Sequence, residues 1–320
     1  MPFKESYPGA AFVLAFRALP IVLLLSAFSA VLWHWRVMPM VIRWLALGLK
    51  ATLKIDGPVA LGAAAKIFVG IVEAAILIRP HLARISRSDL FVMMTTGLTT
   101  LAGTVLVLYA TFLQGVIENA AGHLLVASLI SAPAAIVVAR LMVPPSDGEA
   151  EAASSEDGFA ETRALYDSTM DAMVQGTQDG LRLLLNIIAM LIVFVTMVAL
   201  INQLLGLFPD LWGDPVSLQR LLGWVLAPVA WLIGTKIVLN ELIAYLNLAA
   251  AGESLSERSR VILLYVLASF ANFGSVGIML AGMIAMAPDR KSELVSLGLR
   301  SLVAGTIATC MTSAVVALVI

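Results

Sequence analysis

Three charged residues interrupt stretches of this sequence that are otherwise almost entirely apolar. Lys66 and Glu73 lie in the run AAKIFVGIVEAAILIRP, on either side of Gly70. Glu241 lies in the run GTKIVLNELIAYLNL. A carboxylate near the centre of a bilayer costs roughly 2.5–3.5 kcal/mol on insertion scales, so each glutamate needs a partner or a function. Such a carboxylate either accepts hydrogen bonds from a polar solute or belongs to a structural ion pair, and the sequence leaves both open.

The composition indicates a membrane protein. Of the 320 residues, 60% are hydrophobic and 13% are charged, and the mean hydropathy is +0.97. A soluble domain carries about a quarter charged residues, so a large soluble helical core is a poor alternative. The net charge of −1 gives no reason to expect a nucleic acid partner. Cys310 is the single cysteine, which excludes an internal disulfide and a thiolate metal site.

Long apolar runs predict the helices that cross the membrane. These runs are residues 10–33, 88–113, 122–143, 181–207, 258–287 and 293–320. Ser86 and Asp89 form a capping box at the start of the second run. Two further apolar segments differ from these runs, because 58–80 is broken at a glycine and 235–249 is too short to cross. We therefore expect both segments to enter the bilayer only part of the way.

Two segments have the charge spacing of helices that lie on a membrane surface. Residues 37–54 and 161–180 each place charged or polar side chains on one helical face. Residues 144–160 are polar and acidic, which predicts a solvated loop.

The distribution of lysine and arginine gives an expected orientation. Basic residues flank segment 58–80 on both sides, whereas the connection 114–121 and the turn FPDLWGDP carry none. By the positive-inside rule, both ends of 58–80 face the cytoplasm and the C-terminus lies outside. Arg258 and Arg260 fall on the outer side in this scheme, against the rule. The prediction is a multi-pass protein of the inner (plasma) membrane.

Two parts of the chain share one order of features. Each has a short segment with a glutamate, a turn rich in Ser and Arg, a helix broken at small polar residues, and a further span. An odd number of crossings between the two parts inverts the second. Inverted repeats with discontinuous helices are typical of secondary transporters, whose site lies at the midplane between the repeats.

The expected fold is an all-α polytopic membrane protein with inverted repeats and interfacial helices. Each repeat has a re-entrant helical hairpin, a broken helix and a long spanning helix. The five parts are a spanning and an interfacial helix at 1–57, the first repeat at 58–143, an acidic cytoplasmic loop with an interfacial helix at 144–180, a central span at 181–216, and the second repeat at 217–320.

Four stretches resemble the concentrative nucleoside transporter family. They are GHLLVASLISAPAAIVVARLMVP, GTKIVLNELIAYLNL, LSERSR and FANFGSVGI. The resemblance implies two re-entrant hairpins, each followed by an unwound helix, in a homotrimer that moves nucleosides inward on a sodium or proton gradient. It implies no cofactor. The chain resembles an N-terminally short, divergent member, and it lacks residues that members carry between AWLIG and TKIVLNE. The second hairpin is therefore truncated, or borrows residues 225–233 as its arm.

The first hairpin departs from the family at its tip. Members read G-Q-T-E-A-P where residues 70–75 read G-I-V-E-A-A. Ile71 and Val72 thus replace the glutamine and threonine that, in the family, hydrogen-bond the base, while Glu73 is kept. The resemblance implies a less polar base subsite, and neutral drift in an inactive protein is the alternative.

The second hairpin and the helix after it keep the residues that, in the family, hold ribose. The motif L-N-E is intact, and F-x-N-x-x-S follows in the broken helix. Asparagine and serine in a spanning helix also serve as contacts between helices, which is the alternative. The substrate-binding residues that the resemblance implies are Glu73, Ile71, Val72, Val105, Glu241, Asn240, Phe270, Asn272 and Ser275.

Lys66 stands where sodium-coupled members place an asparagine that helps ligate the ion. The other ligands of that pocket are carbonyls near Val69, Thr100 and Leu101. We expect the Lys66 ammonium to occupy the pocket as a tethered cation, because a pocket for one positive charge does not hold two. Sodium coupling would then be lost, leaving proton coupling, with Glu73 as the proton-binding group, or no coupling. The alternative is that the lysine stem extends to the cytoplasmic face.

The sequence predicts a secondary active transporter that moves a nucleoside or nucleoside-like polar solute, without sodium coupling. It has no G-x-G-x-x-G, Walker, H-E-x-x-H or G-x-S-x-G motif, so an enzyme is not expected. The three histidines have no ligand spacing, so no metal site is expected. The second candidate is a transport-incompetent relative that binds a ligand or assembles with a partner.

Overall fold

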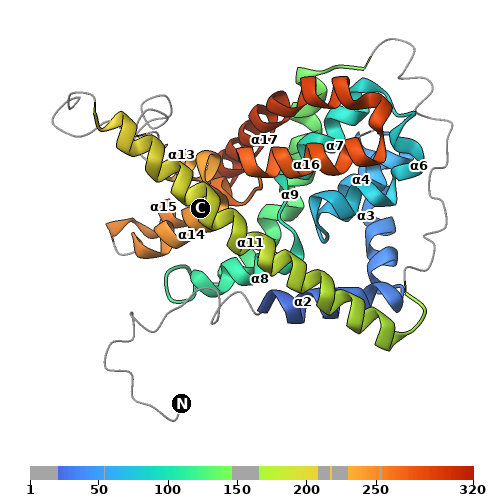
Figure 1. Cartoon of the computed structure of the whole chain (residues 1–320), viewed down its shortest axis with the longest axis horizontal. Coiled ribbons are helices and arrows are strands. Elements are labelled where there is room, and N and C mark those ends of the chain that lie inside the picture. The colour runs from blue at the N-terminus through green and yellow to red at the C-terminus, as the bar shows by residue number, and fades with distance from the viewer. Residues whose placement is uncertain (1–20, 54, 146–165, 208–216, 218–229, 252–253) are drawn as a thin grey trace.

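The structure of the protein is a computed structural model (Figure 1). It describes residues 21–53, 55–145, 166–207, 217, 230–251 and 254–320. All regular elements in these ranges are helices, which confirms the all-α class. Among the described residues, three helical segments are long and apolar enough to cross a membrane, or four if the bent pair α2 and α3 counts as one. The three are Arg87–Phe112, Ala120–Met142 and Pro288–Val319.

The N-terminal part forms a bent pair of helices. Helix α2 (Ile21–His34) covers the end of the span expected at 10–33, whose beginning lies outside the described residues. Helix α3 (Val37–Leu53) coincides with the expected amphipathic segment and is bent by 77° from α2. Its buried residues are Ile42 and Ala46, and the surrounding positions are largely exposed.

The segment expected at 58–80 forms two short helices that pack on each other, α4 (Gly57–Lys66) and α5 (Ile71–Leu77). We call this pair hairpin 1. Its first arm has 10 residues, a length of about 15 Å, which is half of a hydrocarbon core of about 30 Å. Hairpin 1 ends in the single turn α6 (Arg79–Leu82).

A broken helix follows hairpin 1. Helix α7 (Arg87–Thr99) begins where expected, because the Ser86 hydroxyl accepts a hydrogen bond from the Asp89 amide at 3.0 Å. Every residue of α7 after Arg87 is buried, so this helix lies at the centre of the larger apolar core. The chain breaks at residues 100–102 before α8 (Gly103–Phe112). The long helix α9 (Ala120–Met142) follows.

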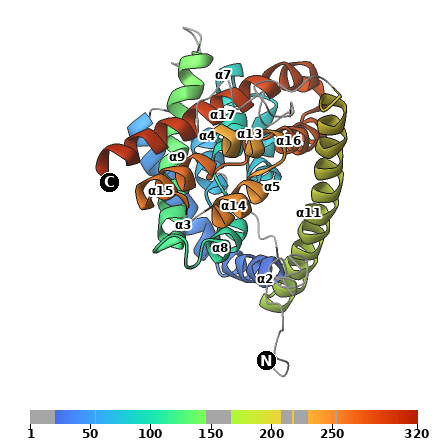
Figure 2. The ribbon, with the colours of Figure 1, turned by 90° about the vertical axis from the view of Figure 1, so that its left-hand side faces the viewer.

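One continuous helix, α11 (Thr169–Leu205), replaces the two helices expected at 161–180 and 181–207. The expectation of a boundary near residue 180 is wrong. The 37 residues of α11 contain no proline, and the pairing of its first turns with α2 keeps them in the helix. Figure 2 shows α11 along one edge of the molecule, with α2 crossing near its N-terminal end.

Two glycines let α11 approach the backbone of α2. A Cβ atom at Gly176 would lie 2.6 Å from the Ala30 Cβ and 2.9 Å from the Ala27 Cα. A Cβ atom at Gly180 would lie 2.9 Å from the Cβ of Ser26. This small-xxx-small spacing is the usual device for close packing of helices in membranes.

Gly176→Leu is expected to destabilise the protein in detergent, because leucine would carry its side chain into α2. Overpacking of a closed contact costs about 1–3 kcal/mol. Thermal unfolding with a fluorescence readout measures the effect. Gly48→Leu is the matched control, since nothing lies within 4 Å of a Cβ at that helical position. Equal melting temperatures for the two variants would contradict the close packing of α2 and α11.

Two further helices form a pair that we call hairpin 2, α13 (Ala230–Val238) and α14 (Glu241–Ala250). Helix α13 runs through the junction of AWLIG and TKIV without interruption. The described first arm of hairpin 2 therefore includes residues 230–233, and its 9 residues leave open both expected options, a truncated arm and an arm borrowed from residues 225–233. Residues 225–229 lie outside the described part of the chain.

The second broken helix and the C-terminal helix follow hairpin 2. Helix α15 (Glu257–Leu267) and helix α16 (Phe273–Met286) are separated by an unwound segment at 268–272, where a break is expected. A short 3-10 turn, η2 (Pro288–Arg290), leads into the long helix α17 (Lys291–Val319). Helix α17 packs on α7, α9 and α15, so it contacts helices from both halves of the chain.

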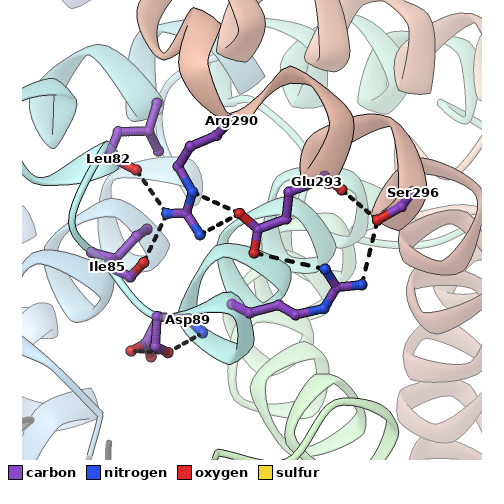
Figure 3. A network of polar contacts seen from close by, with 8 residues as sticks. Leu82, Ile85, Asp89, Arg290, Glu293 and Ser296 are labelled. Carbon is purple, nitrogen blue, oxygen red and sulfur yellow. Dashed lines mark hydrogen bonds and ion pairs between the residues drawn. The ribbon is translucent and has the colours of Figure 1, made fainter.

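A polar network ties the end of hairpin 1 to η2 and α17 (Figure 3). The Arg290 guanidinium donates to the carbonyls of Leu82 at 3.0 Å and Ile85 at 2.7 Å. It also pairs with Glu293 at 2.7 Å. Because one guanidinium satisfies two free carbonyls and a carboxylate, it fixes the segment after hairpin 1 to the start of α17.

Arg258 and Arg260, which oppose the positive-inside rule, each donate to a backbone carbonyl. Arg260 donates to the carbonyl of Val116 and Arg258 to that of Ala317, both at 2.6 Å. These bonds bring the 114–121 connection, the start of α15 and the C-terminal turn of α17 to the same end of the molecule. Arg258 thus bonds a carbonyl in the last turn of α17, and Arg260 bonds one in the connection that follows α8.

Candidate functional site

Glu241 is the centre of a buried polar cluster. It is the first residue of α14 and is 5% exposed. The Tyr109 hydroxyl donates to Oε1 at 2.7 Å, and the Asn272 side-chain amide donates to Oε2 at 2.8 Å. Each carboxylate oxygen therefore has a donor, and the three residues come from α14, α8 and the unwound segment 268–272.

Asn272 is held in place by the start of α16. Its side-chain oxygen accepts the Ser275 amide at 2.7 Å, which makes Asn272 the N-cap of that helix. With the oxygen committed to the cap, the NH₂ group must point the other way, toward Glu241. Ser275, 7% exposed, lies one turn into the same helix.

Asn240 plays the same local role in hairpin 2. Its side-chain oxygen accepts the Ile243 amide at 3.0 Å and caps α14. The cap places Glu241 at the N-terminal end of a helix, where the partial positive charge of the helix dipole favours a carboxylate. In the L-N-E motif, the asparagine therefore caps the helix, and the cap positions the glutamate that follows it.

Tyr109 is a site residue that the sequence reasoning missed. It is fully buried, and its ring lies 4.8 Å from the ring of Tyr245 between centroids. The available signal was a tyrosine in the apolar segment GTVLVLYATF, because a buried tyrosine hydroxyl needs a hydrogen-bond partner. The sequence could not name Glu241 as that partner, since the two residues are 132 positions apart.

Lys66 is buried, with 1% of its surface exposed. Its ammonium lies 3.4 Å from the Val69 carbonyl oxygen and 4.8 Å from the centroid of the Phe270 ring. The alternative in which its stem reaches the cytoplasmic face is therefore wrong. A cation over an aromatic face is attracted by the ring quadrupole, by about 2 kcal/mol or more when desolvated. Lys66 thus links the turn of hairpin 1 to the unwound segment between α15 and α16.

Of the other two expected members of the cation pocket, Thr100 bonds the backbone of Lys66 and Leu101 bonds Ser128 of α9. The Thr100 hydroxyl donates to the Lys66 carbonyl at 3.3 Å. The Leu101 carbonyl accepts from Ser128 at 3.2 Å. Of the three expected carbonyl positions, that of Val69 lies beside the ammonium. The hydroxyl of Thr100 joins the break at 100–102 to hairpin 1.

The remaining site residues that the sequence predicts lie at several places around this cluster. A Cβ at Gly97 would lie 3.6 Å from the Ile71 side chain and 3.7 Å from the Met279 sulfur, so Ile71 faces α7 and α16. Val105 is buried in α8. The backbone of Val72 and Glu73 belongs to α5, and their side chains lie outside the described part of the structure.

A small apolar cavity borders Lys66 and Ile71. Its volume is about 10 Å³, room for about one water molecule. The other residues that line it are Ala74, Ala75, Met93, Gly97, Met279 and Met283. No group of three potential metal ligands occurs within the described ranges.

Two family models match the chain. The model described as Na+ dependent nucleoside transporter C-terminus matches residues 123–317, and the model described as Gate, nucleoside recognition, matches residues 15–115. The first match covers more than half of the chain.

Curated relatives match over nearly the whole chain. An uncharacterized transporter, YutK of Bacillus subtilis, is 36% identical over 94% of this chain and 76% of its own length. The putative nucleoside permease NupX of Escherichia coli is 32% identical over 97% of this chain and 77% of its own. Solute carrier family 28 member 3 of Rattus norvegicus is 35% identical over 98% of this chain, which spans 47% of that longer protein.

The fold matches solved structures as well. The transporter CNTnw in an inward-facing substrate-bound state superposes with a TM-score of 0.85 and 31% identity, over 98% of this chain and 76% of that one. A CNTnw variant in an outward-facing state also gives a TM-score of 0.85, with 30% identity over 98% and 78% of the two chains. The chain therefore belongs to the concentrative nucleoside transporter family, a family of membrane transporters and not of enzymes.

Proposed function

We propose that this membrane transporter carries a nucleoside or a related polyol by alternating access, and that Glu241 binds two hydroxyl groups of the substrate. The observation that supports this is the Glu241 cluster, in which both carboxylate oxygens accept hydrogen bonds at 2.7 and 2.8 Å. A ribose diol offers two O–H donors that would take up the same two oxygens. Each carboxylate oxygen has a further lone pair, so Tyr109 and Asn272 would hold the carboxylate in position while the diol binds.

Ser269 adds a further polar group to this proposal. It lies in the unwound segment with Asn272, and its buried hydroxyl has no hydrogen-bond partner among the described residues. A buried polar group without a partner costs about 1–3 kcal/mol. A substrate hydroxyl that reached Ser269 would recover this energy.

The base subsite is proposed to be less polar than in most of the family. Ile71 replaces an amide side chain and packs with Met279, a flexible apolar residue. Losing an oriented hydrogen bond costs about 1–3 kcal/mol when the substrate's polar edge stays unpaired. The preferred ligand therefore has a ribose-like polyol and an apolar or small remainder.

Transport is proposed to run without sodium, because the Lys66 ammonium is already beside the Val69 carbonyl. Glu73 remains the candidate proton carrier. The proposed setting is a homotrimer in the inner membrane, with the C-terminus outside and with hairpins 1 and 2 entering from opposite faces. The rigid-body alternation of such repeats around a fixed site is the usual mechanism of secondary transporters.

Counterflow of labelled nucleosides in proteoliposomes, paired with a thermal-shift screen of nucleosides and polyols, tests the proposal. Stabilisation by a nucleoside together with counterflow of the same compound is expected. If uridine bound this protein as tightly as it binds a relative with the Gln-Thr tip, the proposal of a less polar base subsite would be contradicted. Stabilisation without counterflow would favour the second candidate, a transport-incompetent protein that binds a ligand. The uninterrupted junction of AWLIG and TKIV in α13 is the observation that supports this candidate.

A further inference from the structure

A second lysine is buried in hairpin 2. Lys236 is fully enclosed, at 0% exposure. Its ammonium donates to the Val266 carbonyl at 2.8 Å and lies 3.5 Å from the Thr309 hydroxyl. One side chain thus joins three elements, α13, α15 and α17. An ammonium in the interior of a membrane protein is costly, so its partners have to compensate for the loss of water.

The partners of Lys236 lie at the negative end of a helix dipole. Val266 is in the last turn of α15, which ends at Leu267. The last carbonyls of a helix lack intrahelical donors and carry about half a negative charge in total. A cation is therefore favoured at this position, and the protein provides one from hairpin 2.

The other end of the break, at the start of α16, carries partial positive charge and has an acidic residue as its partner. Helix α16 begins just after Asn272, so its free amides face the break with partial positive charge. Asn272 caps these amides and donates to Glu241. Hairpin 2 therefore supplies one charge for each end of the break, with Lys236 for the carbonyl end and Glu241 for the amide end.

The two hairpins share an order of residues, although the spacing from lysine to glutamate differs. Both contain Lys-Ile followed by a glutamate, at Lys66 and Glu73 in hairpin 1 and at Lys236 and Glu241 in hairpin 2. Both ammonium groups also approach the same unwound segment, because Lys66 lies over the Phe270 ring and Lys236 bonds the Val266 carbonyl. The break at 268–272 is thus held between two buried cations.

We propose that Lys236 is a fixed cation of the second repeat. Its ammonium fills a cation site at the carbonyl end of α15 and holds the break in the shape in which Asn272 reaches Glu241. Lys236 is a positioning residue and does not touch the substrate itself. The effect on substrate affinity rests on the proposed function, whereas the existence of the cation site does not.

Lys236→Met tests the need for the charge, because methionine fills much of the same volume without it. Nucleoside affinity, measured as Kd and as KM, is expected to weaken about tenfold or more, as for the loss of a hydrogen bond to a charged group, with the maximal rate less affected. Lys291→Met, at the exposed start of α17, is the control. A folded Lys236→Met protein with unchanged affinity would overturn the proposal.

Lys236→Ala with added n-propylammonium tests the site independently of transport. The truncation leaves a space that this amine matches in length and charge. The melting temperature of the variant is expected to fall and to rise again with propylammonium chloride, but not with n-propanol or with choline chloride at the same ionic strength. If the variant is not recovered folded, its yield of monodisperse protein from membranes solubilised with and without the amine gives the same readout.

The outcomes separate this inference from the proposed function. Rescue by propylammonium in a protein that binds no nucleoside would support the cation site and refute the substrate assignment. Absence of rescue of Lys236→Ala, with neither melting temperature nor yield responding to the amine, would overturn the cation site even if nucleosides are transported.

Discussion

Glu241→Gln is expected to lower nucleoside binding and uptake by about 100-fold or more. The carboxylate accepts from Tyr109 and Asn272, and hydrogen bonds to a charged group contribute about 1.5–3 kcal/mol each. Glutamine has one acceptor oxygen and no charge, so it can accept from only one of the two donors, and the bonds that remain are neutral. The substrate hydroxyls would lose the same charged acceptor. Isothermal titration and uptake into proteoliposomes measure the two quantities.

A milder variant of the same cluster and a control variant accompany Glu241→Gln. Tyr109→Phe removes only one of the two donors, so its effect is expected to be about tenfold. Glu118→Gln changes an exposed glutamate and is expected to have no effect. If Glu241→Gln bound and transported nucleosides like the wild type, the substrate-binding role of the cluster would have to be abandoned.

Lys66→Asn is expected to make transport depend on sodium. The wild-type ammonium lies beside the Val69 carbonyl and under the Phe270 ring. Removing it leaves a buried space beside the Val69 carbonyl oxygen, and the new side chain adds an amide oxygen; both are ligands that a small hard cation prefers. Uptake by the variant should rise several-fold when sodium replaces choline outside the vesicles, whereas wild-type uptake should stay unchanged. Radiolabelled uptake at matched ionic strength measures both.

Two results would contradict the tethered-cation assignment. One is stimulation of the wild type by sodium, because a pocket already filled by an ammonium has no place for a second cation. The other is a Lys66→Asn protein that folds and transports at the wild-type rate in the absence of sodium. Lys291→Asn, which removes an exposed lysine at the start of α17, controls for a change in net charge.

Signals that act over a few residues were sufficient to predict most helices of this protein. Ser86 and Asp89 mark the start of α7 as expected, since a cap involves residues only three positions apart. The unwound segment 268–272 lies at the small polar residues that predicted it. The apolar composition and the quoted motifs were enough for the membrane class and the family, because these properties are contained in the chain itself.

The tertiary structure decided which of these elements meet. Tyr109 and Glu241 are 132 positions apart, and no local pattern specifies that one hydroxyl should find one carboxylate. The same holds for Lys236, which in sequence is one lysine in an apolar run and in the fold bonds the end of α15. The continuity of α11 depends on its contact with α2 at Gly176. Sequence patterns report the preferences of neighbouring residues, whereas buried charges choose their partners only when packing removes water from around them.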